Sequence, residues 1–124
     1  MLEILYLLVA AAQPASLAPP PVRAAPRASL AAYFSRDDYP ASARAGSEEG
    51  HVAFQLLIGS DGRVTGCTVL GSSVSSSLDS TTCRIMRSRA RFTPALNASG
   101  RPVPDSVGSS ITWRLPRSVP SSSP

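Results

Sequence analysis

The side chains of this chain that could carry out chemistry are few and far apart. Its sulfur and imidazole groups are Cys67, Cys83 and the single histidine, His51, apart from two methionines. A catalytic or zinc site needs several titratable groups that converge, and two distant cysteines with one histidine do not have such spacing. We therefore predict no catalytic residue, no metal site and no cofactor, and we expect a protein that is not an enzyme.

Two other clusters suggest chemistry but have simpler explanations. The serines between 72 and 77 lack a Gly-x-Ser-x-Gly elbow, and the only histidine lies well before them. The acidic pairs Asp37-Asp38 and Glu48-Glu49 do not have the spacing of a calcium loop. We interpret the acidic residues as solvated, and we expect Ser77 to cap a following helix.

The two cysteines are better explained as a structural disulfide. There is no Cys-x-x-Cys motif, and paired cysteines in a small domain are typical of an exported protein. Cys67 falls on an expected strand and Cys83 on an expected helix, so a bridge would pin the helix to the sheet. It would stabilise the fold by about 3 kcal/mol.

The charge pattern gives little support for a nucleic-acid partner. The net charge is +4, and all twelve basic residues are arginine. Four arginines follow closely in one helix and its exit: Arg84, Arg87, Arg89 and Arg91. No aromatic residues alternate with them to stack on bases, so we interpret them as a solvated helix face and expect no nucleic-acid partner.

The ends of the chain are predicted to lie outside the folded domain. Residues 1–18 contain an apolar stretch from Leu2 to Ala12, which is too short to span a bilayer and is typical of a signal peptide or a truncated membrane anchor. Residues 19–36 are rich in proline and alanine and predict an extended linker that buries little. Residues 116–124 are predicted to form a disordered tail.

The region between these ends, residues 37–115, predicts one small α+β domain. Alternating residues predict strands over 51–58 and 63–70, joined at Asp61-Gly62, and a third, exposed strand over 107–115. Apolar residues at helical spacing predict a helix from Leu78 to Arg91. The strand pattern places Cys67 and Val69 on one face, with Val64, Thr68 and Leu70 on the other. The inward stripe of the helix is expected to be Leu78, Thr82, Ile85, Met86 and Arg89.

The order of these elements and several short motifs resemble the C-terminal domain of the TonB family. The matching pieces, in chain order, are Tyr39-Pro40-Ala41, Glu49-Gly50-His51-Val52, Asp61-Gly62-Arg63-Val64, Ser72-Ser73, Leu78-Asp79, Arg91-Phe92-Thr93-Pro94-Ala95, Gly100-Arg101-Pro102-Val103 and Ile111-Thr112-Trp113-Arg114-Leu115. The resemblance implies a β-β-α-β domain with a three-stranded antiparallel sheet and one packed helix.

The resemblance also implies a partner and a location. A TonB-like domain in the periplasm binds an extended segment of an outer-membrane receptor by adding it beside the last strand, and supports energy-dependent transport. The partner-binding residues implied here are Tyr39, Pro40, Val107, Ser109, Ile111 and Trp113. If the N-terminus is anchored in the inner membrane, a proton-motive complex there is a further partner.

Two alternatives stay open at this stage. The domain is either such a receptor-binding module or a stand-alone periplasmic module that does not transduce energy. Small sheets with open edges are prone to exchange strands between two copies of a chain. A strand-exchanged homodimer is therefore another expected form of this protein.

Overall fold

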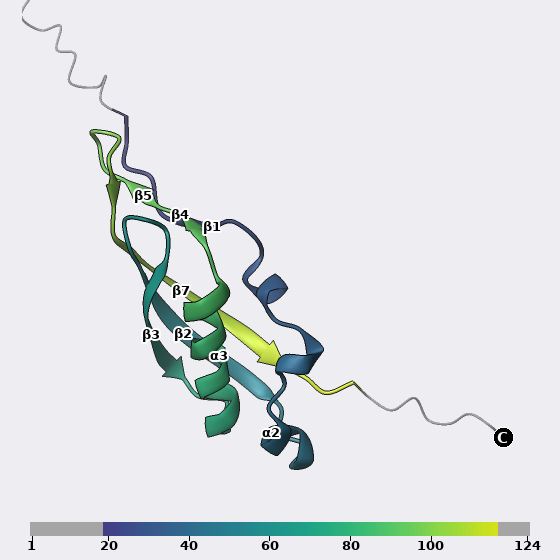
Figure 1. Cartoon of the computed structure of the whole chain (residues 1–124). Coiled ribbons are helices and arrows are strands. Elements are labelled where there is room, and N and C mark those ends of the chain that lie inside the picture. The colour runs from purple at the N-terminus through teal and green to yellow at the C-terminus, as the bar shows by residue number, and fades with distance from the viewer. Residues whose placement is uncertain (1–18, 117–124) are drawn as a thin grey trace, which may run out of the picture.

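Three antiparallel strands form the central sheet of the computed structural model, which describes residues 19–116. The strand order is β3-β2-β7, with β2 (Gly50–Ile58) between β3 (Val64–Gly71) and β7 (Asp105–Trp113) (Figure 1). The predicted α+β fold with β-β-α-β order is confirmed. The expected signal peptide or anchor, residues 1–18, and the tail from residue 117 onward lie outside the described residues.

Helix α3 (Ser76–Arg89) follows β3 and covers one face of the sheet. Leu78, Thr82, Ile85 and Met86 are buried as the helical spacing predicts, whereas Arg89 is exposed and forms an ion pair. The predicted cap at Ser77 is wrong. Ser75 begins the helix, because its Oγ accepts the Leu78 amide proton at 3.2 Å while Asp79 occupies the first turn.

The inner face of the sheet is apolar, as the alternation in β2 predicts. Val52, Phe54, Leu56 and Ile58 are all buried in the core. The prediction that Val64 lies on the face opposite Cys67 and Val69 is wrong, since Val64 is buried in the core against which those two residues pack. The register shifts between Leu57 and Ile58, and such a bulge turns the following side chain to the opposite face.

Residues 19–36 were expected to bury little, and the structure differs from that expectation. Ala24 and Leu30 are buried in the core, and Tyr33 and Phe34 pack against it. We call residues 22–39 the N-terminal strap. It contains β1 (Ala25–Pro26) and the 3-10 turns η3 (Leu30–Tyr33) and η4 (Arg36–Asp38), and it is followed by the short helix α2 (Ala41–Ala45).

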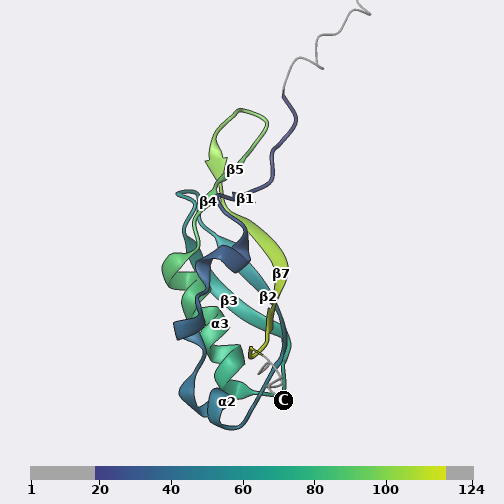
Figure 2. The same cartoon turned by 90° about the vertical axis from the view of Figure 1, so that its right-hand side faces the viewer.

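The strap is attached to the end of the domain where α3 finishes. Strand β1 pairs with β4 (Phe92–Thr93), and Val22 exchanges two backbone hydrogen bonds of 2.9 Å with Leu96. A further small hairpin pairs β5 (Ala95–Leu96) with β6 (Pro102–Val103). The side view in Figure 2 shows α3 on one side of the sheet, with the strap beside it.

Two ion pairs hold the strap in place. Arg23 Nε donates to Asp105 Oδ2 at 2.8 Å, and Arg89 Nη1 donates to Asp38 Oδ2 at 2.7 Å. Hydrogen bonds from these guanidinium groups lower the pKa of each carboxyl, Asp38 and Asp105, from 3.8 to about 2. The strap is thus linked electrostatically both to the start of β7 and to the end of α3.

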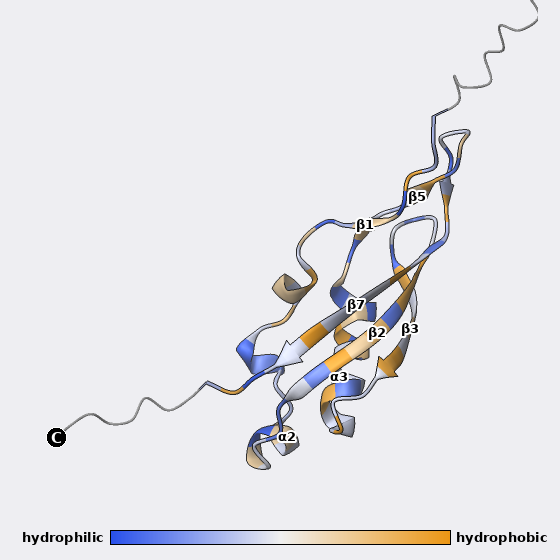
Figure 3. Ribbon diagram, turned by 180° about the vertical axis from the view of Figure 1, so that it is seen from behind, coloured by the Kyte–Doolittle hydropathy of each residue, from blue (hydrophilic) through white to orange (hydrophobic). Residues whose placement is uncertain are grey.

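The opposite face of the sheet carries no covering element among the described residues. Figure 3 views the molecule from this side, with the three strands in front of α3. Leu57 is 52% exposed there, and Leu70 is 65% exposed. The domain is therefore a two-layer structure with a single core, between the sheet on one side and α3 with the strap on the other.

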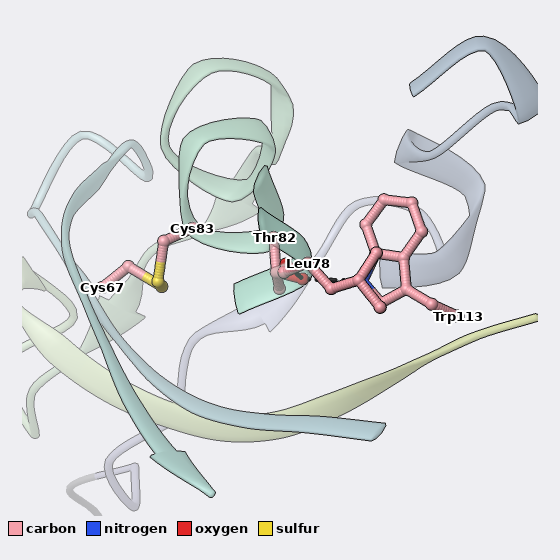
Figure 4. The surroundings of a disulfide bond; sticks show 5 residues. All are labelled: Cys67, Leu78, Thr82, Cys83 and Trp113. Carbon is pink, nitrogen blue, oxygen red and sulfur yellow. Dashed lines mark hydrogen bonds between the residues drawn. A yellow bond between two sulfur atoms is a disulfide. The ribbon is translucent and has the colours of Figure 1, made fainter. Parts of the chain in front are cut away.

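The predicted disulfide between Cys67 and Cys83 is present. It joins β3 to α3 with a Cα–Cα distance of 5.5 Å, within the usual range for such a bond (Figure 4). The bridge lies at the outer edge of the sheet, on the side away from β7. It fixes the helix over the two strands that it covers.

Replacing Cys83 with serine should lower the free energy of unfolding by about 3 kcal/mol in oxidising buffer, because the cross-link no longer restricts the unfolded chain. The measurement is a denaturant titration with and without reductant. The wild-type midpoint should fall on reduction, whereas the Cys83→Ser midpoint should not respond. Equal midpoints for the oxidised wild type and the variant would contradict a stabilising bridge.

Stability should also decrease in acid because of Asp38 and Asp105, the two carboxylates whose ion pairs hold the strap. Their pKa values are lower in the folded state, so their contribution is present above pH 3.8 and is lost as pH falls toward 2. Unfolding followed by circular dichroism from pH 6 to pH 2 measures this loss. Asp38→Asn should be less stable at pH 6 and should lose less stability between pH 4 and 2. An unchanged acid profile would count against the ion pair with Arg89.

Candidate functional site at the free edge of strand β7

A groove of about 410 Å³ runs between the end of β7 and the N-terminal strap. Its lining on the strap side is Ala31, Phe34, Ser35, Arg36 and Tyr39. On the β7 side it is lined by five consecutive residues, 110–114. Successive side chains of a strand point to opposite faces, so contact with all five places the groove along the edge of the strand rather than over one face.

Trp113 forms the inner wall of this groove. Its side chain comes from the end of β7 and points toward α3, where Nε1 donates to Thr82 Oγ1 at 2.8 Å (Figure 4). The ring of Phe34 packs edge-on at 5.4 Å between centroids, and that of Tyr39 at 5.2 Å. Because Trp113 is only 5% exposed, it shapes the groove as a fixed part of the core.

Tyr39 is held in position from two sides. Its hydroxyl donates to the carbonyl oxygen of Glu48, and the guanidinium of Arg44 lies 5.4 Å from its ring centroid. Burial, and to a smaller extent the charges of Glu49 and Glu48, raise the pKa of the phenol. The ring therefore stays neutral near pH 7 and acts as a rigid apolar wall.

Two arginines give the rim of the groove a positive charge. Arg36 and Arg114 are exposed on its two sides, and none of the residues in 19–116 that line the groove is acidic. Just beyond β7, the amide of Leu115 donates to Glu49 Oε2 at 2.7 Å, which fixes the direction in which the chain leaves the strand. The site can therefore accept an extended backbone beside apolar walls, with acidic side chains near its ends.

The predicted partner-binding residues are brought together only in part. Tyr39, Ile111 and Trp113 line the groove. Pro40 lies next to it as the N-cap of α2. Val107 and Ser109 lie further along β7 on the inner face and are half-buried.

Sequence reasoning missed the strap side of the groove. Ala31, Phe34, Ser35 and Arg36 fall in or beside the region interpreted as a linker. The signal that could have found this wall is the apolar and aromatic run from Leu30 to Phe34, which is unusual in a solvated linker. The prolines before this run led to the interpretation of residues 19–36 as an extended linker.

The side chains that could bind a metal ion do not cluster within residues 19–116. No group of three or more His, Cys, Asp and Glu side chains that could hold a metal ion is found in that range. His51 Nδ1 lies 2.9 Å from Thr112 Oγ1 across the β2–β7 pair. A search of the same residues for helices long and apolar enough to cross a membrane found none.

The fold is that of a small α+β domain with a groove along one edge of its sheet. Residues 35–115 match the family described as Gram-negative bacterial TonB protein C-terminal, and the chain belongs to this family. It is also similar to the solution structure of the TonB C-terminal domain of Pseudomonas aeruginosa. That match has 28% sequence identity and a TM-score of 0.51, and it covers 65% of this chain and 80% of the other. A comparison with curated proteins found no match.

Family membership implies a role in TonB-dependent transport and interaction with outer-membrane receptors. The family is associated with the cell envelope. Members act as energy transducers or interaction modules rather than as enzymes. Most of the strap precedes the matched region, so one wall of the groove is contributed partly by residues outside the family match.

Replacing Thr82 with valine should destabilise the domain by about 1–3 kcal/mol, because Trp113 Nε1 is then buried without an acceptor. Thr82→Ser is the matched control, since it keeps the hydroxyl and should cost less. Thermal unfolding monitored by tryptophan fluorescence reports both the stability and the environment of this ring. If the valine and serine variants unfold alike, the hydrogen bond does not hold Trp113 in place.

Proposed function

We propose that this protein binds an extended segment of an outer-membrane TonB-dependent receptor by strand addition at β7. The observation that carries the proposal is the position of the groove along the free edge of this nine-residue strand. An edge strand has backbone N–H and C=O groups that its one neighbour does not use, and an added segment can pair with them.

The position of the groove supports the C-terminal end of β7 as the main binding region. Residues 110–113 of β7 and the following Arg114 lie opposite the strap. A bound segment would therefore have β7 on one side and Phe34 and Tyr39 on the other. Main-chain bonds would provide most of the affinity. Apolar side chains of the segment would contact the aromatic wall, and an acidic side chain would pair with Arg36 or Arg114.

Strand addition also explains why the wall is rigid. Trp113 is fixed by Thr82, and Tyr39 is fixed by Glu48, so little side-chain freedom remains to be lost on binding. This arrangement favours binding of a short segment. In the envelope, such binding would couple the domain to the receptor during energy-dependent transport.

The test uses synthetic peptides that cover the periplasmic N-terminal segments of TonB-dependent receptors from the source bacterium. A peptide that binds should lose most of its affinity when alternate backbone amides are N-methylated, because those N–H groups pair with β7. Isothermal titration calorimetry with the full chain measures the effect. The control is N-methylation of the intervening amides, which point away from β7 and should change affinity little.

Two results would overturn strand addition at this edge. One is equal affinity of the two N-methylated series, which would indicate binding through side chains alone. The other is a bound peptide that leaves the β7 amide resonances unshifted in NMR spectra. If the free protein instead forms a dimer through β7, the peptide should dissociate it, which sedimentation measures.

A further inference from the structure

Three arginines lie in a row across three neighbouring backbone segments, away from the groove. Arg63 forms an isolated antiparallel bridge with Arg91. On the other side, the amide of Arg27 donates to the carbonyl oxygen of Arg91 at 2.9 Å, and continuing the β1–β4 register by one residue sets Arg27 opposite Arg91. Residues opposite one another on antiparallel segments share a face. We call Arg27, Arg63 and Arg91 the arginine row.

The arginine row lies at the C-terminal end of α3, because Arg91 falls between the end of that helix and the start of β4. The residue after Arg91 is Phe92, which is buried in the core, so Arg91 lies on the opposite side of the backbone. Arg27 and Arg63 are exposed, and Arg91 is half-buried. Arg91 Nη1 donates to the carbonyls of Ser88 and Ala90, which keeps this guanidinium close to the end of the helix.

The charges of the row are not neutralised by carboxylates within residues 19–116. The ion pairs in that range use Arg23 and Arg89 instead. Asp61 is the nearest acidic residue in the sequence, and its Oδ1 accepts the backbone amide of Arg63. Like charges placed opposite one another destabilise a pairing of strands. The row therefore lowers the stability of the folded domain, and an anionic partner would remove this electrostatic repulsion.

Two acidic residues lie at the other end of α3, away from the arginine row. Asp79 lies in the first turn of the helix, and Glu48 Oε1 accepts a hydrogen bond from Ser75, the N-cap. At the C-terminal end, Asp38 is paired with Arg89, and exposed Arg87 adds positive charge one turn before Arg91. The C-terminal end of α3 is therefore the end that suits an anionic surface.

We propose that the arginine row docks this domain on the surface of an anionic phospholipid bilayer. Guanidinium groups bind phosphate through paired hydrogen bonds, and three of them on adjacent segments spread over roughly 10 Å. The neighbouring ring of Phe92 is buried and unable to stack on bases, which disfavours a nucleic acid. Bilayers bound the envelope in which this family acts, and the apolar stretch Leu2–Ala12 precedes the strap in the sequence.

The experiment measures binding of the full chain to vesicles of phosphatidylcholine alone and with 30% phosphatidylglycerol. The wild type should prefer the anionic vesicles, and the preference should decrease with salt. Arg27→Gln with Arg63→Gln should reduce binding to anionic vesicles roughly fivefold for each arginine. The matched control is Arg84→Gln with Arg101→Gln, which removes the same charge from exposed positions outside the row and the groove and should change binding to anionic vesicles much less. Unfolding midpoints verify that both pairs fold.

Several outcomes would overturn the proposal. Equal binding of wild type to neutral and anionic vesicles would assign membrane affinity to the apolar stretch alone. If the row variant and the control lose the same amount of binding to anionic vesicles, the binding depends on net charge and not on the row. If the row variant loses binding to soluble polyglutamate but not to vesicles, the surface recognises an acidic protein. Receptor-peptide binding at β7 should be unchanged in the row variant, so this proposal and the proposed function fail separately.

Discussion

Helix α3 lies toward one edge of the sheet, and the candidate site depends on this position. Helix α3 packs mainly against β3 and β2, where the disulfide holds it. The inner face of β7 must therefore be covered by something else. The N-terminal strap and the indole of Trp113 complete the core there.

The wall of the groove is formed by the residues that cover β7 in place of α3. Trp113 spans the gap between β7 and α3, because its indole N–H donates to the hydroxyl of Thr82, a fully buried residue of the helix. Thr82 is itself fixed by donating to the carbonyl of Leu78 at 2.8 Å. Phe34 and Tyr39 then pack on the indole edge-on. The same residues that complete the core thus form the apolar side of the binding edge.

Charge serves two separate purposes in this small domain. Arg23 and Arg89 are paired with carboxylates and attach the strap at two distant points. Arg27, Arg63 and Arg91 have no such pairing within residues 19–116, although they lie close together in space. Interpreting the helix arginines as one solvated face overlooked this difference. All three members of the row lie outside α3, so helical spacing alone could not have revealed it.

The sequence by itself determined the elements and their order, because alternation, helical spacing and turn residues act over short distances. Gly62 is an example: it has φ of +85°, and a Cβ there would lie 2.1 Å from the carbonyl oxygen of Phe92. The disulfide was predictable for the same reason, since each cysteine fell on a recognisable element. Only the tertiary structure decided the face of Val64, the cap at Ser75 and the role of the strap. The bulge against β2, the hydrogen bond from Ser75 Oγ to Glu48 Oε1 and the burial of Leu30 in the core are contacts between different segments of the chain, which the pattern within one segment does not specify.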